Sequence, residues 1–244
     1  MGAPFFRFKQ FEVWHDRCAM KVGTDGVLLG AWCPLPLRKT SHARVLDIGT
    51  GSGLIALMIA QRLKERASEF NILGIDIDSD AVEQSQINFK QSPWAKHLEA
   101  KECKLQDFQS EKLFDLIVSN PPYFQNSLKN PNNARATARH TDSLSYQSLI
   151  GCAAELLAEQ GVLGLVLPID AEQEIISLAR EHRLQTTHIT YVHSKPGKEV
   201  KRILISLTKQ LEMDFEPIST HFYIESETAP RSDEYNEITK DFYL

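Results

Sequence analysis

A glycine-rich stretch with a single carboxylate is the first candidate for chemistry in this sequence. The run from Val45 to Gly53 reads VLDIGTGSG and contains Asp47, Gly49 and Gly51. Glycine adopts backbone conformations that side chains forbid, and it lets a ligand touch the main chain. The pattern therefore predicts a buried strand, a glycine turn over which a ligand binds, and a helix. The alternative is a tight turn with nothing bound.

The spacing of the glycines separates two kinds of nucleotide site. A dinucleotide site needs G-x-G-x-x-G, but Gly53 comes one residue early and Leu54 stands where the third glycine belongs. Asp47, just before the turn, would repel a pyrophosphate and attract a cationic amino group. This D-x-G-x-G-x-G run resembles the binding loop of S-adenosylmethionine-dependent methyltransferases of the Rossmann-like class. The resemblance implies S-adenosylmethionine as cofactor, bound by Asp47, Gly49, Gly51 and Gly53.

Two further acidic residues each follow a predicted strand. Asp76 is placed to accept both ribose hydroxyls, as an acidic residue about 20 positions beyond such a loop does. Asp107 with Phe108 resembles the pair that meets the cofactor adenine. Either carboxylate alone fits a solvated or capping role equally well, and their shared position after strands favours ligand binding.

The tetrad Asn120-Pro121-Pro122-Tyr123 is the second candidate. Two prolines fix two backbone φ angles and remove two N–H donors. The Asn120 amide oxygen and the Pro121 carbonyl then form two acceptors for one NH2 group, and Tyr123 supplies a flat face. Stacking a nucleobase on such a ring is worth roughly 1–3 kcal/mol. The alternative is an ordinary proline turn.

This tetrad strongly resembles the N-P-P-Y of methyltransferases that act on amino nitrogens, namely adenine N6, cytosine N4 or a glutamine amide. The resemblance implies that Asn120, Pro121 and Tyr123 are catalytic, that Asn120 also borders the cofactor, and that Pro122 meets the substrate.

Regular alternation of strands and helices must position these two motifs. It predicts an α/β fold of the Rossmann-like class I methyltransferase type, with a mostly parallel seven-stranded sheet, helices on both faces and a C-terminal antiparallel hairpin. The expected strands are 44–48, 71–75, 98–103, 114–119, 162–167, 185–192 and 200–208. The expected helices are a segment after Gly53, 79–91 with Ser79 as its cap, 144–159 and 171–182.

The two ends of the chain extend this sheet. Residues 5–18 predict a short strand or hairpin, and Thr24-Asp25-Gly26 is typical of a cap before a helix over 27–32. We expect one methyltransferase domain over 1–244, composed of the hairpin and helix (1–40), the cofactor-binding sheet (41–209) and an acidic extension (210–244) whose last residues form a docked helix.

Composition and charge indicate the class of protein and the compartment in which it works. The 244 residues carry a net charge of -5 and are 42% hydrophobic, which is ordinary for a soluble globular protein. We expect no metal, no membrane span and no signal peptide. The four cysteines form no C-x-x-C pair, which indicates free thiols in a reducing cytoplasm. We expect a cytoplasmic monomer.

Basic residues supply candidates for contacts with an RNA substrate. Arg135, Arg139 and His140 follow the tetrad in a polar loop, which is either a lid over the base or merely solvated. A second group either grips phosphates or is a solvated surface, and it consists of Lys195, Lys198, Lys201 and Arg202.

The whole chain resembles the bacterial tRNA(Val) adenine-37 N6-methyltransferases. The resemblance rests on the opening FRFKQF, on residues 20–30 (MKVGTDGVLLG), on both motifs above, on Ala138-Arg139-His140 and on the closing KDFYL. It implies tRNA as partner and N6-methylation of adenine, and it places Thr24 and Asp25 beside the cofactor's methionine end. The alternatives are a protein glutamine N5-methyltransferase, another rRNA or DNA amino-methyltransferase, or a cofactor-binding module without turnover.

Overall fold

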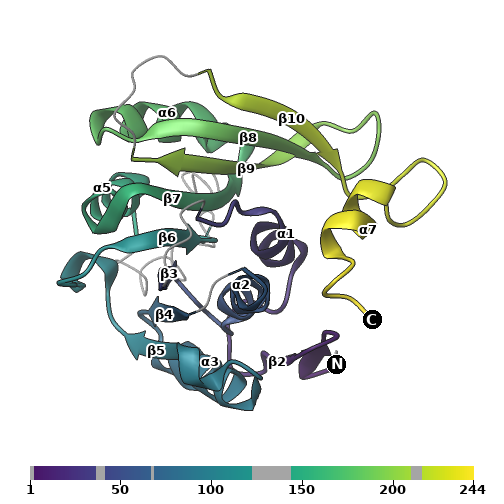
Figure 1. Ribbon diagram of the computed structural model, residues 1–244. Helices are drawn as coiled ribbons and strands as arrows, with labels where there is room; N and C mark the ends of the chain where they lie inside the picture. The colour runs from purple at the N-terminus through teal and green to yellow at the C-terminus, as the bar shows by residue number, and fades with distance from the viewer. Residues whose placement is uncertain (1–2, 37–41, 67–68, 123–143, 210–215) are drawn as a thin grey trace, which may run out of the picture.

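The computed structural model is built around one eight-stranded sheet with strand order β10-β8-β9-β7-β6-β3-β4-β5 (Figure 1). It describes residues 3–36, 42–66, 69–122, 144–209 and 216–244. The strands of the sheet are β3 (Ala43–Ile48), β4 (Phe70–Asp76), β5 (Leu98–Glu102), β6 (Phe114–Ser119), β7 (Leu157–Pro168), β8 (Gln185–His193), β9 (Val200–Thr208) and β10 (Ile218–Tyr223).

Strand direction decides where the loops meet. β3 is parallel to both β4 and β6, and β7 is parallel to β6. β9 runs antiparallel to β7 and to β8, while β10 is parallel to β8. The ends of β3, β4, β6, β7, β8 and β10 and the start of β9 therefore lie along one edge, which we call the carboxyl edge. Ligands of open α/β sheets bind at this edge.

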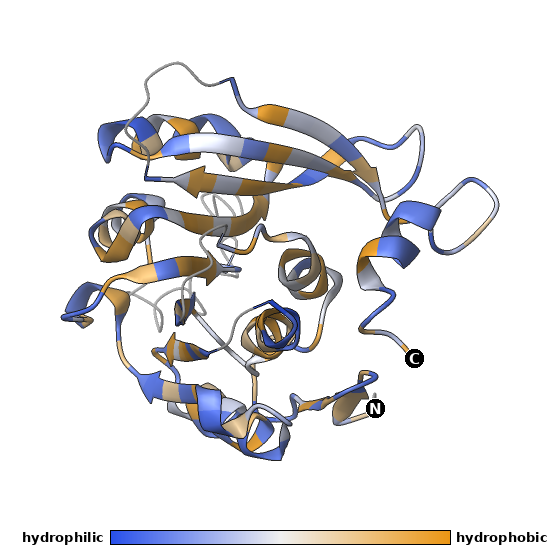
Figure 2. Ribbon diagram, in the orientation of Figure 1, coloured by the Kyte–Doolittle hydropathy of each residue, from blue (hydrophilic) through white to orange (hydrophobic). Residues whose placement is uncertain are grey.

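Helices cover both faces of the sheet, as the sequence predicts. α1 (Thr24–Trp32), α2 (Leu54–Lys64) and α3 (Ser79–Gln91) contribute to one hydrophobic cluster, and α5 (Tyr146–Leu156) and α6 (Glu172–Glu181) contribute to the other. Consecutive residues of a central strand alternate between the two clusters, because side chains of a strand point to opposite faces. Burial on both faces gives the central strands the continuous hydrophobic runs seen in Figure 2.

The two termini pack together beside α1 and α2. The hairpin of β1 (Phe5–Arg7) and β2 (Glu12–Trp14) precedes α1, and α7 (Asp233–Thr239) closes the chain (Figure 1). The backbone N–H of Lys9 donates to the Phe242 carbonyl at 2.7 Å. The Phe8 and Tyr243 rings stack with centroids 5.8 Å apart. The predicted hairpin and the predicted docked helix are both confirmed.

The sheet has one strand more than the seven predicted. β10 lies within the acidic extension and pairs in parallel with β8 at the outer edge. Its sequence ISTHFY buries only Phe222. A strand with so few buried apolar residues lacks the alternating hydrophobic pattern from which strands are predicted. The sequence pattern therefore does not predict β10.

Several element boundaries and caps differ from the prediction, and β7 begins at Leu157, five residues before the predicted strand over 162–167. α1 begins at Thr24 with Gly23 as its N-cap, so the predicted cap over Thr24–Gly26 is wrong. The cap of α3 is Asp78, whose side chain accepts from the Asp80 N–H, and not Ser79.

The predicted helix over 144–159 ends at Leu156, because Leu157 already pairs with Phe114 of β6. The β6–β7 register then shifts between Phe114 and Leu116. Gln160, at φ 62°, lies in the irregular stretch that follows Leu157 on β7.

The close contact between α1 and α2 predicts the effect of Gly30→Ala. A Cβ at Gly30 would lie 2.7 Å from Met58 Sδ and 2.9 Å from Met58 Cβ. The side chain's sulfur can move, but its Cβ cannot, so the substitution overpacks this interface. We expect a loss of about 1–3 kcal/mol in the free energy of unfolding, measured in urea. Gly151→Ala is the matched control, because its nearest neighbour is the movable His182 ring at 3.2 Å, and it should lose nothing.

Candidate functional site

The glycine loop between β3 and α2 is held at the carboxyl edge by its own backbone. The N–H groups of Gly49 and Thr50 both donate to the carbonyl of Ile75, at 2.9 and 3.0 Å. Gly49 and Gly51 have φ angles of +69° and +54°, and a Cβ on either would meet nothing within 4 Å. The main chain of the loop therefore faces open space that a ligand can enter.

Gly53 has a different reason to be glycine. Its φ is +79°, and a Cβ there would lie 2.4 Å from Cε1 of Phe89 in α3. The missing side chain lets α3 pack against the start of α2. Gly74 of β4 makes room in the same way, because its Cβ would lie 2.7 Å from Thr50 Oγ1. The sequence analysis missed Gly74, and only its place inside a predicted strand could have marked it as a close approach of backbone.

Asp47 lies below the loop and is 1% exposed. Thr50 Oγ1 donates to its Oδ2 at 2.8 Å. Burial raises the pKa of Asp47 to about 7, although Thr50 and the backbone N–H of Ala56 oppose the rise. Oδ1 is buried and has no partner of ordinary hydrogen-bond geometry among the described residues. A buried carboxylate oxygen without a donor is costly, and a cationic group bound nearby would favour its charged form.

Asp76 faces the same loop from the end of β4. Its Oδ2 accepts from the Gly51 N–H at 2.9 Å, and its Oδ1 accepts from the Asp78 N–H at 3.1 Å. These two bonds fix the half-buried carboxylate beside the open glycine loop, and each oxygen keeps a lone pair for a ligand hydroxyl.

The Asp76 carbonyl also accepts from the Cys103 N–H at 2.8 Å, which ties the loop after β5 to this site. Asp107 and Phe108 follow in that loop. Asp107 is exposed at the end of a single 3-10 turn (Leu105–Asp107), and Phe108 is half-buried, with its ring centroid 6.2 Å from that of Phe114.

The tetrad lies next to the glycine loop because of strand register. Ser119, the last residue of β6, is paired with Ile48, the last residue of β3. Ser119 Oγ also donates to the Ile48 carbonyl at 2.8 Å. Asn120 and Gly49 therefore leave neighbouring strands at the same level. Asn120 is half-buried, Pro121 is buried and Pro122 is exposed. The other predicted residues of this region lie outside the described part of the chain, and they are Tyr123, Arg135, Arg139 and His140.

The first turn of α1 reaches the same edge. A Cβ at Gly26 would lie 3.0 Å from Leu54, the first residue of α2, so the two helix starts are in contact. Thr24 is half-buried, and the Asp25 carboxylate is ion-paired with Nε of Arg202 on β9. Arg202, predicted as a phosphate contact, is thus bound to a predicted cofactor residue, whereas Lys195, Lys198 and Lys201 are exposed.

Asn88 of α3 is a site residue that the sequence analysis missed. Its Nδ2 donates to the carbonyls of Ser52 and Trp14, both at 2.8 Å, and its Oδ1 accepts from the Trp14 N–H at 3.0 Å. The side chain is fully buried, so it locks the glycine loop, α3 and the N-terminal hairpin together. The sequence feature that could have identified Asn88 is a polar residue next to Phe89 on the apolar side of a predicted helix.

Comparison with known proteins shows the family to which the chain belongs. The model of the methyltransferase small domain family matches residues 35–189. A tRNA1(Val) (adenine(37)-N6)-methyltransferase of Phocaeicola vulgatus is 46% identical, covering 100% of this chain and 99% of that protein. The enzyme of the same name from Yersinia enterocolitica is 42% identical, covering 98% and 92%. The chain belongs to this methyltransferase family.

Solved structures with low identity support the fold of this family. A protein described as an O-methyltransferase from Agrobacterium tumefaciens superposes with a TM-score of 0.65 at 17% identity, over 89% of this chain and 96% of that one. A protein described as a class I S-adenosylmethionine-dependent methyltransferase from Listeria monocytogenes gives 0.61 at 11% identity, over 90% and 71%. The predicted Rossmann-like class I methyltransferase fold is confirmed.

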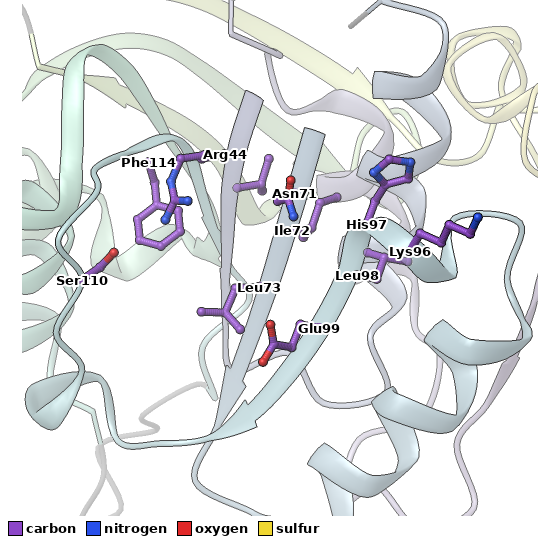
Figure 3. A pocket seen from close by; sticks show the side chains of 11 residues that line it. Arg44, Asn71, Ile72, Leu73, Lys96, His97, Leu98, Glu99, Ser110 and Phe114 are labelled. Atoms are coloured by element: carbon purple, nitrogen blue, oxygen red, sulfur yellow. The ribbon is translucent and has the colours of Figure 1, made fainter. Parts of the chain in front are cut away.

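A cavity of about 340 Å³ lies at the edge of the sheet where the parallel strands begin, and Figure 3 shows the side chains that line it. Arg44, Asn71, Leu98 and Phe114, which line it, belong to the first two residues of β3, β4, β5 and β6. The cavity is therefore separated from Gly49 and Asn120 by the length of the strands.

The described residues contain no group of three or more His, Cys, Asp or Glu side chains arranged to hold a metal ion. None of their helices is long and apolar enough to cross a membrane.

Asp76→Ala should weaken cofactor binding, because the carboxylate is the fixed acceptor beside the glycine loop. A hydrogen bond to a charged group contributes about 1.5–3 kcal/mol, so we expect Kd for S-adenosylmethionine to rise by about 10- to 100-fold in calorimetry. Asp80→Ala removes a nearby exposed carboxylate of α3 and is the control. Equal affinity of the Asp76 variant and the wild type would end this assignment.

Burial of Asp47 predicts a pH dependence of stability in the protein without cofactor. A raised pKa means that the folded state binds the proton more tightly than the unfolded state. The stabilisation is therefore complete below the unfolded pKa and is lost as pH rises toward about 7. Relative to Asp47→Asn, the wild type should lose roughly 2–3 kcal/mol between pH 5 and pH 8 in urea unfolding. If the free energy of unfolding of the two proteins varied in parallel with pH, the prediction would be wrong.

Proposed function

We propose that this protein is an S-adenosylmethionine-dependent methyltransferase that acts on N6 of adenine 37 in tRNA1(Val). Support comes from the relatives of that name at 42–46% identity over nearly the whole chain. The observation that carries the proposal is the pairing of Ile48 with Ser119, because it puts the candidate cofactor loop and the candidate amine clamp side by side.

The residues at the carboxyl edge fit the proposed cofactor. The open space over Gly49 and Gly51 admits a ligand against the main chain. Asp76 presents a fixed carboxylate to a pair of ribose hydroxyls. The buried carboxylate of Asp47 lies below the loop, where a cationic amino-acid group would favour its charged form. The bound cofactor would supply an electrophilic methyl group.

Asn120 and Pro121 would act on the substrate amine. The side-chain oxygen of Asn120 and the carbonyl of Pro121 accept the two N–H bonds of an exocyclic amine and hold it in one orientation. Both hydrogen bonds strengthen as positive charge develops on the nitrogen, so they stabilise the transition state more than the bound substrate. The amine needs no general base before transfer, and orientation carries most of the acceleration. Tyr123 would stack on the base.

A base in a tRNA loop suits this site. An unpaired or splayed base reaches a pocket at lower energetic cost than a base inside a duplex. We propose that Pro122, exposed at the end of β6, meets the substrate beside Asn120.

The proposal is tested with two transcripts of tRNA1(Val) that differ only at position 37. The purified protein and labelled cofactor should methylate the transcript with adenine and leave the one with guanine unlabelled, and nucleoside mass spectrometry should identify N6-methyladenosine. Label in a release factor and none in tRNA would instead favour glutamine methylation.

Asn120→Ala should separate catalysis from binding. Because the amide stabilises developing charge on the amine, we expect kcat to fall by about two orders of magnitude or more, by analogy with losing one transition-state donor. Cofactor affinity in calorimetry should stay within about two-fold, since Asp76 and the glycine loop are intact. Glu155→Gln, at an exposed position near the end of α5, where the chain enters the start of β7, is the control. A fully active Asn120 variant would remove the clamp from the mechanism.

A further inference from the structure

The turn between β8 and β9 lies at the same edge of the sheet as the glycine loop. β7 ends at the carboxyl edge, and its last residue Pro168 is paired with Arg202 near the start of β9. β8 runs antiparallel to β9, so His193 ends there as well. β8 is three strands away from β6 in the sheet order, which corresponds to about 14 Å between strand axes.

The basic residues of this hairpin divide into two groups. Arg202 is ion-paired with Asp25 of α1. A register shift between Val192 and His193 makes Lys201 the extra residue beside Arg202, and bulges of this kind re-aim side chains. Lys201, Lys195 and Lys198 are all exposed, and within the described part of the chain none of them is paired with a carboxylate, so their charges face solvent.

Beside these lysines, β8 and β10 carry a continuous row of rings. Tyr191 stacks on His221 with centroids 5.3 Å apart, His221 lies 5.1 Å from His193, and His193 stacks on Tyr223 at 4.7 Å. Parallel pairing places Tyr191 opposite His221 and His193 opposite Tyr223. We call these four side chains the β8–β10 ladder.

Hydrogen bonds hold the ladder in one arrangement. His193 Nδ1 lies 2.8 Å from the Lys198 carbonyl, which can only accept, so Nδ1 carries the proton. His193 Nε2 is then the acceptor for Nδ1 of His221, also at 2.8 Å. This chain leaves His221 Nε2 as the ring nitrogen that no described hydrogen bond uses, on a residue exposed to solvent. The ladder is thus an ordered row of rings in which His221 is exposed, while Tyr191, His193 and Tyr223 are half-buried.

Local charge favours an anionic partner over a neutral one. The turn from 194 to 201 carries three lysines against one acidic residue, Glu199, in a protein whose net charge is -5. Arg202 is neutralised by Asp25, and Lys209 donates to the carbonyls of Ala154 and Leu157 at the other end of β9. Two glutamates border the ladder, because Glu172 accepts from the Tyr191 hydroxyl and Glu234 accepts from the Tyr223 N–H. Exposed rings that stack bases next to lysines that contact phosphates are the two elements by which proteins hold single-stranded nucleic acid.

We infer that the β8–β10 ladder and the three lysines Lys195, Lys198 and Lys201 form a second contact for the tRNA, outside the methylation site. An unstacked nucleotide of the anticodon loop packs on the rings, and its neighbouring phosphates meet the lysines. The inference rests on the proposed function, since it assigns the surface that holds the RNA while an adenine occupies the clamp.

The charge half of the inference is tested with the triple variant K195A/K198A/K201A. We expect KM for tRNA to rise by about ten-fold or more at constant kcat, with unchanged Kd for S-adenosylmethionine. The slope of log Kd against log salt for tRNA should become shallower by about 2, because each phosphate contact on a single strand contributes about 0.7. K195R/K198R/K201R should keep the wild-type slope.

The matched control removes three exposed lysines from the other end of the strands, in K90A/K96A/K112A. Lys90 ends α3, while Lys96 and Lys112 precede β5 and β6. This variant has the same net charge as the first triple variant, so a general loss of charge would affect both alike. Only the hairpin variant should lose tRNA affinity.

The stacking half is tested with H221A/Y223A. Loss of one stacked base should raise Kd for tRNA five-fold or more while leaving the salt slope unchanged, since stacking on a ring removes no phosphate contact and releases no counterion. Y223F, which keeps the ring, should bind as the wild type does. Circular dichroism shows whether H221A/Y223A folds. If it unfolds, K195A/K198A/K201A alone tests the inference, because that variant alters only exposed side chains.

The outcomes separate this inference from the proposed function. A wild-type protein that methylates tRNA, with hairpin variants of unchanged KM and salt slope, overturns the inference alone. Variants that change only the oligomeric state in sedimentation also overturn it, because the surface is then a protein interface. A wild-type protein that never methylates tRNA overturns the proposed function itself.

Discussion

The register between β3 and β6 is the constraint on which the candidate site depends. Two parallel strands paired residue by residue, from Val45 with Leu116 to Ile48 with Ser119, must release their following loops at the same level of the sheet. β4 pairs with β3 on the other side and brings Asp76 to that level as well. A shift of one residue would move these loops apart and turn every buried side chain of the strand to the wrong face.

Buried polar groups then fix the shape of the loop. Thr50 bonds to Asp47, Asn88 bonds to the Ser52 carbonyl, and Asp76 bonds to the Gly51 N–H. Backbone groups that lie near a ligand are thereby oriented before the ligand arrives, which lowers the ordering cost of binding. Asp47 is buried beneath this network, and one of its oxygens has no partner of ordinary hydrogen-bond geometry among the described residues.

Much of this arrangement is visible in the sequence because it follows from local patterns. The glycine spacing around Gly49 and the proline pair after β6 predict the two halves of the candidate site, and the alternation of strands and helices correctly predicted the fold. Features that depend on contacts between distant parts of the chain are harder to predict from the sequence. β10 has one buried residue and owes its place to pairing with β8, and the role of Gly53 depends on where Phe89 of α3 packs. The pairing of Arg202 with Asp25 joins residues 177 positions apart, which no local pattern announces.

A crystal structure of the protein with S-adenosylhomocysteine tests the central claim most directly. The account predicts that the ligand lies against the main chain of Gly49 and Gly51, with its ribose hydroxyls on Asp76 and its sulfur facing Asn120. Ligand density in the cavity lined by Arg44 and Phe114, or an Asn120 side chain directed away from the bound sulfur, would contradict it.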